Sequence, residues 1–172
     1  MAQTKINRRE LVQRHNVVNR GTDSLSSLSV GNGRFAFTVD ATGLQTFPRH
    51  YDKGIPLGTQ SEWGWHSFPN KENFKFSETL EPYNFNKTNS LYAVQSKTMS
   101  ERSKQAVDYF RQNPHRLQLG NVGLEIQKKD GSIVTPQDLL EIHQELNLWT
   151  GAITSTFKIE GVLVKVITCA NA

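Results

Sequence analysis

Aromatic and polar side chains gather between residues 54 and 70, and together they are suited to binding a sugar. Two of the three tryptophans, a histidine and a phenylalanine lie within the six residues from Trp63 to Phe68. The C–H faces of a sugar lie on aromatic rings, while amide and carboxylate groups bind its hydroxyls. The residues that we expect to contact a carbohydrate are Gln60, Glu62, Trp63, Trp65 and His66.

The same rings have a second interpretation, in which they close one end of a β-sandwich core. Buried tryptophan is a common core anchor, so the residue types alone leave both interpretations open. Glycines and prolines surround the rings, and they predict that this stretch is neither helix nor strand. An irregular region is expected from Pro48 to about Tyr83, and a loop of that length is usually functional or part of an interface.

Glycoside hydrolysis needs two carboxylates about 5 to 10 Å apart, on either side of the scissile bond. The carboxylates near the aromatic stretch are those of Asp52, Glu62 and Glu72, but the sequence does not place any two of them as a pair. The five histidines lack the close spacing of a metal site, and the single cysteine forms no disulfide within the chain. We therefore expect no metal and no cofactor.

Composition narrows the possible partners of this chain of 172 residues. The net charge is +4, but the basic residues are scattered, which argues against a nucleic-acid interface. No apolar run approaches the roughly 18 residues that cross a membrane, and the first residues contain no apolar segment of the kind found in signal peptides.

Alternating apolar residues predict a mainly β fold. Residues 35–39 and 44–47 are expected to pair as a hairpin, and residues 117–126 are expected to form strands. A helical turn at 135–138 and a strand at 142–149 follow. Two further strands, 152–159 and 162–169, continue an antiparallel meander, since short glycine turns connect them. The last strand is apolar on both faces, so we expect it to be central and covered.

One helix is clearly indicated, between Ser100 and Gln112. Thr98 or Ser100 can cap its start, Thr98 and Glu101 have the spacing of a capping box, and Pro114 ends it. The predicted fold is an antiparallel β-sandwich with one clear helix and a long aromatic-rich loop. The predicted organisation is a lead-in at 1–24 and a sandwich at 25–172 that is incomplete at its C-terminal end.

Four segments resemble six-hairpin glycosidases, which are enzymes with an (α/α) barrel that include the maltose and kojibiose phosphorylase group. The segment Glu145–Phe157 with Gly161 and Val162 resembles a recurring part of their N-terminal β-sandwich. Residues 25–47, 58–66 and 113–117 resemble segments of uncharacterised bacterial glycoside hydrolases of this superfamily.

The resemblance implies a supersandwich-like N-terminal domain that supports a catalytic barrel and helps to shape the entrance of its sugar site. The catalytic carboxylates of this superfamily lie on the barrel, so we expect none in this chain, and we expect the missing barrel and a carbohydrate as partners. It also implies a periplasmic or secreted location. The alternatives are a stand-alone carbohydrate-binding module and an interaction domain without a ligand.

Overall fold

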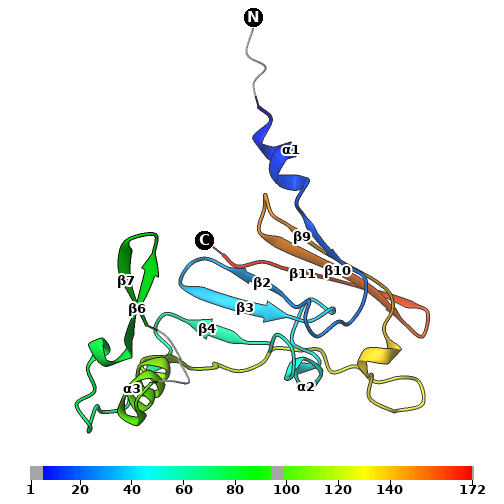
Figure 1. Ribbon diagram of the computed structural model, residues 1–172. Coiled ribbons are helices and arrows are strands. Elements are labelled where there is room, and N and C mark those ends of the chain that lie inside the picture. Colours follow the sequence, from blue (N-terminus) through cyan, green and yellow to red (C-terminus); the bar gives the residue numbers. More distant parts are fainter. Residues whose placement is uncertain (1–5, 94–98, 172) are drawn as a thin grey trace, which may run out of the picture. The chain divides into compact units, whose positions relative to one another are not determined.

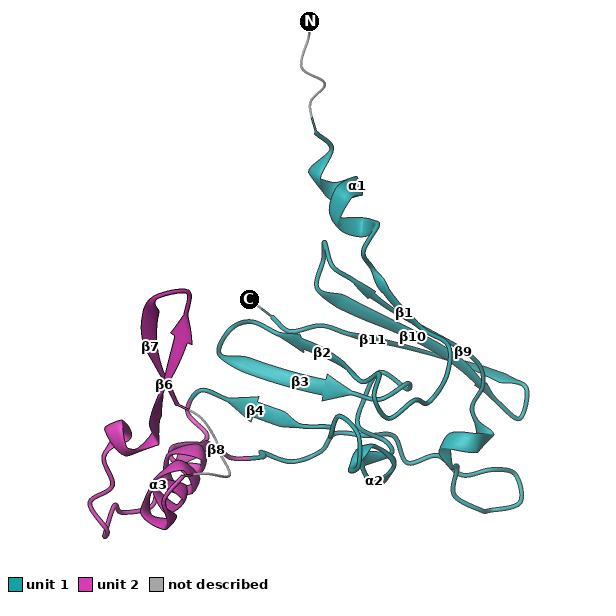
Figure 2. Ribbon diagram, in the orientation of Figure 1, with its two compact units in different colours: residues 1–62, 118–172 teal, residues 63–117 magenta. Residues whose placement is uncertain are grey.

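The computed structural model describes residues 6–93 and 99–171. The chain forms two compact units, which are coloured separately in Figure 2: unit 1 comprises residues 1–62 and 118–172, and unit 2 comprises residues 63–117. The fold is mainly β with antiparallel sheets, as predicted. No helix among the described residues is long and apolar enough to span a membrane.

Unit 1 contains most of the strands (Figure 1). Its helices and strands are α1 (Arg8–Gln13), β1 (Val17–Asn19), β2 (Leu28–Gly31), β3 (Phe35–Val39), α2 (Pro48–Tyr51), β4 (Thr59–Ser61), the 3-10 turn η2 (Pro136–Asp138), β9 (Leu140–Asn147), β10 (Ala152–Ile159) and β11 (Val162–Thr168). They form a four-stranded sheet in the order β1-β9-β10-β11 and a three-stranded sheet in the order β2-β3-β4.

Residues of both sheets share the first core cluster. Its members are Leu28, Val30, Phe37, Val39 and Ile153. The burial of β10 alternates strictly along its eight residues, because one face meets the core and the other does not. A second core cluster, formed by Val134, Leu139, Phe157 and Ile159, lies farther along the same face of β10.

Unit 2 consists of a helix, a long hairpin and a short ribbon. Its elements are β5 (Trp65–His66), the 3-10 turn η1 (Phe76–Thr79), β6 (Leu80–Phe85), β7 (Thr88–Ala93), α3 (Glu101–Gln112) and β8 (His115–Arg116). β6 pairs with β7, and β5 pairs with β8. The predicted helix is confirmed as α3: the Ser100 side chain caps it by accepting a hydrogen bond from the backbone N–H of Ser103. Thr98 lies outside the described residues.

The predicted strand at residues 44–47 is wrong. The Asp40 carboxylate accepts hydrogen bonds from the backbone N–H groups of Thr42 and Phe47, each 2.8 Å long, and these bonds hold residues 40–47 as a compact buried loop. The backbone N–H of Gln45 then donates to the carbonyl of Val122, so this segment bonds to a different part of the chain from the predicted one.

Residues 117–126 are also irregular, against the prediction. Only isolated contacts tie this segment to its neighbours, such as the hydrogen bond from the Leu124 N–H to Thr46 Oγ1, so no strand ladder forms. The stretch from residue 54 to 70 was predicted to contain no strand, yet it includes β4 and β5. β4 pairs with β3, and β5 pairs with β8.

The meander formed by β9, β10 and β11 is confirmed, but the predicted central place of the last strand is wrong. β11 is an edge strand of the four-stranded sheet. Val164 and Val166 pack against the second core cluster, whereas Leu163 and Ile167 are exposed on the opposite face. The apolar pattern indicated burial of both faces, and among the described residues only one face is covered.

β1 belongs to the predicted lead-in at residues 1–24, and it pairs with β9, with Val18 opposite Glu145. Part of the lead-in is therefore an edge strand of the four-stranded sheet. The predicted boundary at residue 24 stays a prediction.

Candidate functional site

A polar pocket of about 450 Å³ lies in unit 1, on the face of the three-stranded sheet that points away from the core. Phe37 and Val39 of β3 point into the first core cluster, so Ala36 and Thr38 face the other way. Gln60 of β4 is opposite Ala36 in the register and lies on the same outer face. The residues that line the pocket are Ala36, Thr38, Pro48, Asp52, Pro56, Leu57, Gly58, Gln60, Gln118 and Asn121.

Three segments hold the polar groups of this pocket in place. Gln60 is part of β4, Asp52 follows α2, and Gln118 and Asn121 come from the segment that returns from unit 2. Gln118 Oε1 accepts a hydrogen bond of 2.7 Å from the backbone N–H of Thr59, and Gln118 Nε2 donates to Asn121 Oδ1 at 2.6 Å. These bonds orient both amides before any ligand arrives.

Two lining side chains are available to a ligand. Gln60 and Asp52 are exposed, and within the described chain no hydrogen bond or ion pair occupies either side chain. The Gln60 amide offers a donor and an acceptor, and the Asp52 carboxylate offers acceptors. Apolar contact comes from Pro48, Pro56 and Leu57. A pocket of this volume, with a few converging polar groups, is suited to a small hydroxyl-rich molecule.

The pocket has one carboxylate among its lining residues, that of Asp52. Glu62 does not line it and instead forms an exposed ion pair with Arg34, with 3.6 Å between Oε1 and Nε. Glu72 belongs to unit 2. The lining therefore offers hydrogen-bonding groups and one carboxylate, but it does not supply the pair of carboxylates that glycoside hydrolysis requires.

The structure places Trp63, Trp65 and His66 in unit 2, whereas Gln60 and Glu62 belong to unit 1. Trp63 is 73% exposed and Trp65 is 54% exposed, and neither belongs to a core cluster. The interpretation in which these rings fill the core is therefore wrong. Neighbouring residues of a strand point to opposite faces, so Trp65 and His66 do not share one platform on β5.

His66 instead joins a small ring cluster. Its ring lies 4.8 Å from that of Phe68 and 5.4 Å from that of His115, measured between centroids. Phe68 and His115 are stacked, with 5.5 Å between their centroids. The cluster is fixed at the end of α3, because the Tyr109 hydroxyl donates to the carbonyl of Phe68. Across the described chain, no three His, Cys, Asp or Glu side chains gather in a way that could hold a metal ion.

Two buried groups near α2, Asp40 and Tyr51, have shifted pKa values. Burial raises the pKa of the Asp40 carboxyl, and hydrogen bonds from Thr42 and Phe47 oppose this effect. Burial and the nearby Asp40 raise the pKa of Tyr51 to about 12. Both residues are 2% exposed or less, so neither can reach a ligand. Their role is to organise the loop that carries α2.

Sequence reasoning identified Gln60 as a binding candidate and Asp52 as a nearby carboxylate, but it missed Gln118 and Asn121. Nothing in the local sequence around Asn121 indicated that it lines the same pocket as Gln60. No family model, no curated protein and no solved structure matches the chain.

Proposed function

We propose that this chain is a non-catalytic domain of a carbohydrate-active enzyme and that it binds a sugar in the polar pocket. The observation that carries the proposal is the convergence of Gln60, Asp52 and the preoriented Gln118–Asn121 pair in one cavity of about 450 Å³. The Gln60 amide, the Asp52 carboxylate and the oriented Asn121 amide match the hydroxyls of a neutral sugar.

The exposed tryptophans support the same ligand class independently. Trp63 and Trp65 lie on the surface of unit 2, where a sugar face can stack on them. The pocket and the tryptophans are two separate contact regions in this proposal. A periplasmic or secreted location belongs to the proposal as well, as the resemblance to six-hairpin glycosidases implies.

The test is a titration of the full chain with a panel of neutral mono- and disaccharides, followed by NMR of the side-chain amides. We expect saturable shifts of the Gln60 and Asn121 amide signals with at least one sugar. Gln60→Ala should weaken binding about tenfold, which is the effect of one hydrogen bond to a ligand hydroxyl. Gln137→Ala is the matched control, since Gln137 is also exposed and lies outside the pocket.

The contribution of unit 2 needs its own comparison. Trp63→Ala should reduce the change in tryptophan fluorescence on adding the sugar, whereas Trp149→Ala should not, because Trp149 is an exposed ring of unit 1. If no sugar shifts the Gln60 or Asn121 signals, the pocket does not bind carbohydrate. In that case the proposal fails.

A second candidate function is structural support of another domain. The observation that favours it is the apolar outer face of β11, where Leu163 is 64% exposed and Ile167 is 62% exposed. An exposed apolar strand at a sheet edge is an interface feature in many proteins. Leu163→Lys with Ile167→Lys should then reduce binding of a hydrophobic dye without lowering thermal stability. Unchanged dye binding would count against an interface on β11.

A further inference from the structure

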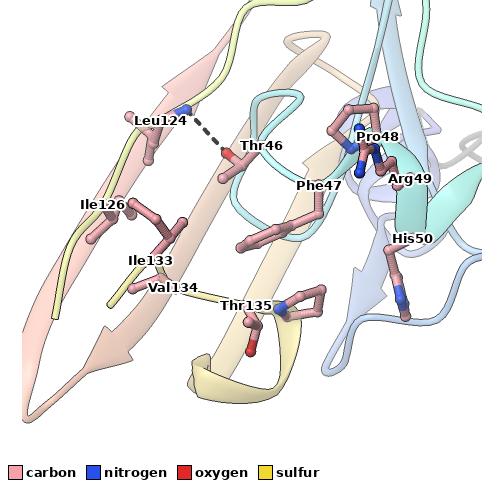
Figure 3. Close-up of a pocket in the computed structure, with 11 residues that line it drawn as sticks. Thr46, Phe47, Pro48, Arg49, His50, Leu124, Ile126, Ile133, Val134 and Thr135 are labelled. Atoms are coloured by element: carbon pink, nitrogen blue, oxygen red, sulfur yellow. Dashed lines mark hydrogen bonds between the residues drawn. The ribbon is translucent and has the colours of Figure 1, made fainter. Parts of the chain in front are cut away.

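Unit 1 has a second cavity that differs in chemistry from the polar pocket. It encloses about 510 Å³ and is shown in Figure 3. The residues that line it are Thr46, Phe47, Pro48, Arg49, His50, Leu124, Ile126, Ile133, Val134, Thr135 and Pro136. Most of these side chains are apolar. The Phe47 ring is directed across the cavity toward Ile133 and Val134 (Figure 3).

The walls of this cavity are held in place by the second core cluster. Val134 is a member of that cluster, and Phe47, Leu124 and Ile126 pack against it. The backbone N–H of Leu124 donates to Thr46 Oγ1 at 3.2 Å, which is the dashed line in Figure 3, and the N–H of Val134 donates to the carbonyl of Ile126 at 3.0 Å. Because these contacts already hold the walls in place, the protein would lose little conformational entropy when an apolar ligand binds.

Arg49 is the charged side chain of the lining, which also contains His50, and no Asp or Glu of the described chain lines the cavity. The His50 ring is engaged, since Nε2 lies 2.5 Å from the carbonyl oxygen of Thr22. Three acids lie within two residues of the lining in sequence, but none of them lines the cavity: Asp52, Glu125 and Asp138. Glu125 is exposed, and Asp138 forms an ion pair with Lys128, with 3.1 Å between Oδ1 and Nζ. Arg49 has no ion-pair partner among the described residues, so its guanidinium is available to an anion.

We infer that this cavity binds an amphipathic carboxylate, whose apolar body lies among Phe47, Leu124, Ile126 and Val134 and whose carboxylate pairs with Arg49. A guanidinium matches the geometry of a carboxylate, and burial of the apolar ligand body against these walls is favourable because it removes apolar surface from water. The site is independent of the proposed sugar pocket, which has Pro48 as its only lining residue in common with this cavity.

The test uses the full chain with decanoate as the probe and decanol as the uncharged ligand of equal chain length. Binding is measured by titration calorimetry and by NMR shifts of the Val134 and Leu124 methyl groups. We expect decanoate to bind saturably, with affinity falling about fourfold for each methylene removed. Decanol should bind about tenfold more weakly than decanoate, because it lacks the charge-assisted contact. 2-Naphthoate, an aryl carboxylate, tests whether the cavity prefers an aromatic ligand body to an alkyl chain. Binding of either decanoate or 2-naphthoate through Arg49 supports the inference.

Three variants distinguish a built site from general attraction to a basic protein. Arg49→Gln should remove the preference for decanoate over decanol, while Arg20→Gln, at an exposed arginine outside the cavity, should keep it. Ile133→Trp should abolish binding of both ligands by filling the cavity, and Ile133 is 55% exposed, so the fold should tolerate it. Equal effects of Arg49→Gln and Arg20→Gln, or absence of saturable binding to the wild-type chain, would overturn the inference.

Discussion

Gln118 Oε1 accepts a hydrogen bond of 2.7 Å from the backbone N–H of Thr59, and this bond joins two parts of unit 1 that are separated in sequence by the whole of unit 2. The backbone N–H of Leu119 donates in turn to the carbonyl of Thr59 at 2.9 Å. The returning chain is therefore bonded alongside β4, and one wall of the polar pocket depends on that attachment.

Gln118→Ala should lower both stability and sugar affinity. The lost hydrogen bonds are partly exposed, so we expect the free energy of unfolding to fall by about 0.5–1 kcal/mol. Sugar affinity should fall as well, because Asn121 loses the donor that orients it. Gln60→Ala should lower affinity alone. Urea unfolding and sugar titration of both variants make the comparison, and a Gln118→Ala chain with unchanged affinity would show that this wall does not contribute to binding.

Local sequence signals predicted the elements whose partners are close in the chain. α3 carries its own cap at Ser100 and its own stop at Pro114, and β10 and β11 show their pairing in their alternation and in the turn at Glu160 and Gly161. The polar pocket was only partly predictable. Gln60 and Asp52 stand near the aromatic stretch, but the contribution of Gln118 and Asn121 depends on how the chain returns to β4.

The two wrongly predicted strands, at residues 44–47 and 117–126, have a common physical origin. Residues 44–47 and 117–126 alternate as strands do, yet the Asp40 carboxylate and the Thr46 hydroxyl satisfy backbone N–H groups that a strand ladder would otherwise bond. A side chain that competes with the ladder is not visible in the apolar pattern. The edge position of β11 was missed for a different reason. The sequence shows that both faces of this strand are apolar, but it does not show whether another element covers each face.

Gly43 and Gly33 form a matched pair that separates close packing from backbone strain. Both have positive φ, +84° and +88°, but a Cβ at Gly43 would lie 2.8 Å from Ser155 Oγ, whereas nothing lies within 4 Å of one at Gly33. Gly33→Ala should lower the free energy of unfolding by about 1 kcal/mol, because alanine is strained at positive φ. Gly43→Ala should lower it by about 1–3 kcal/mol more, because its Cβ also clashes with Ser155. Thermal or urea unfolding measures the difference. Equal losses would mean that the contact with Ser155 relaxes freely.

Gln144 is a buried residue that ties β9 to the loop at residues 40–47. Its Nε2 donates to the carbonyl of Asp40 at 2.7 Å and to Ser155 Oγ at 2.9 Å, and the side chain is almost fully buried. Gln144→Leu keeps most of the side-chain volume but leaves these two acceptors without their donor. It should therefore lower the free energy of unfolding by about 2 kcal/mol. Gln137→Leu, at an exposed position, is the control and should change stability by less than about 0.5 kcal/mol. Similar losses in both variants would contradict a role for the buried bonds.

The lowered pKa of the Asp138 carboxyl makes the stability of the fold depend on pH in the acid range. Hydrogen bonds from the Thr135 hydroxyl and backbone N–H, followed by one from Lys128, lower the pKa of this carboxyl from 3.8 to about 2. A carboxyl whose folded pKa is lowered stabilises the fold above its unfolded pKa, and that contribution is lost as the pH falls through the folded value. The wild-type chain should therefore lose stability between about pH 4 and pH 2 through this group.

Asp138→Asn should remove that part of the acid response. The variant should be less stable than the wild type at pH 6, because the hydrogen bond and ion pair to Lys128 are weakened, and the difference should shrink as the pH approaches 2. Asp108→Asn is the control, since Asp108 is an exposed acid of α3 in the other unit. Urea unfolding at pH 6, 4, 3 and 2 gives the comparison. A constant difference between Asp138→Asn and the wild type across this range would show that the carboxylate does not carry the acid dependence assigned to it.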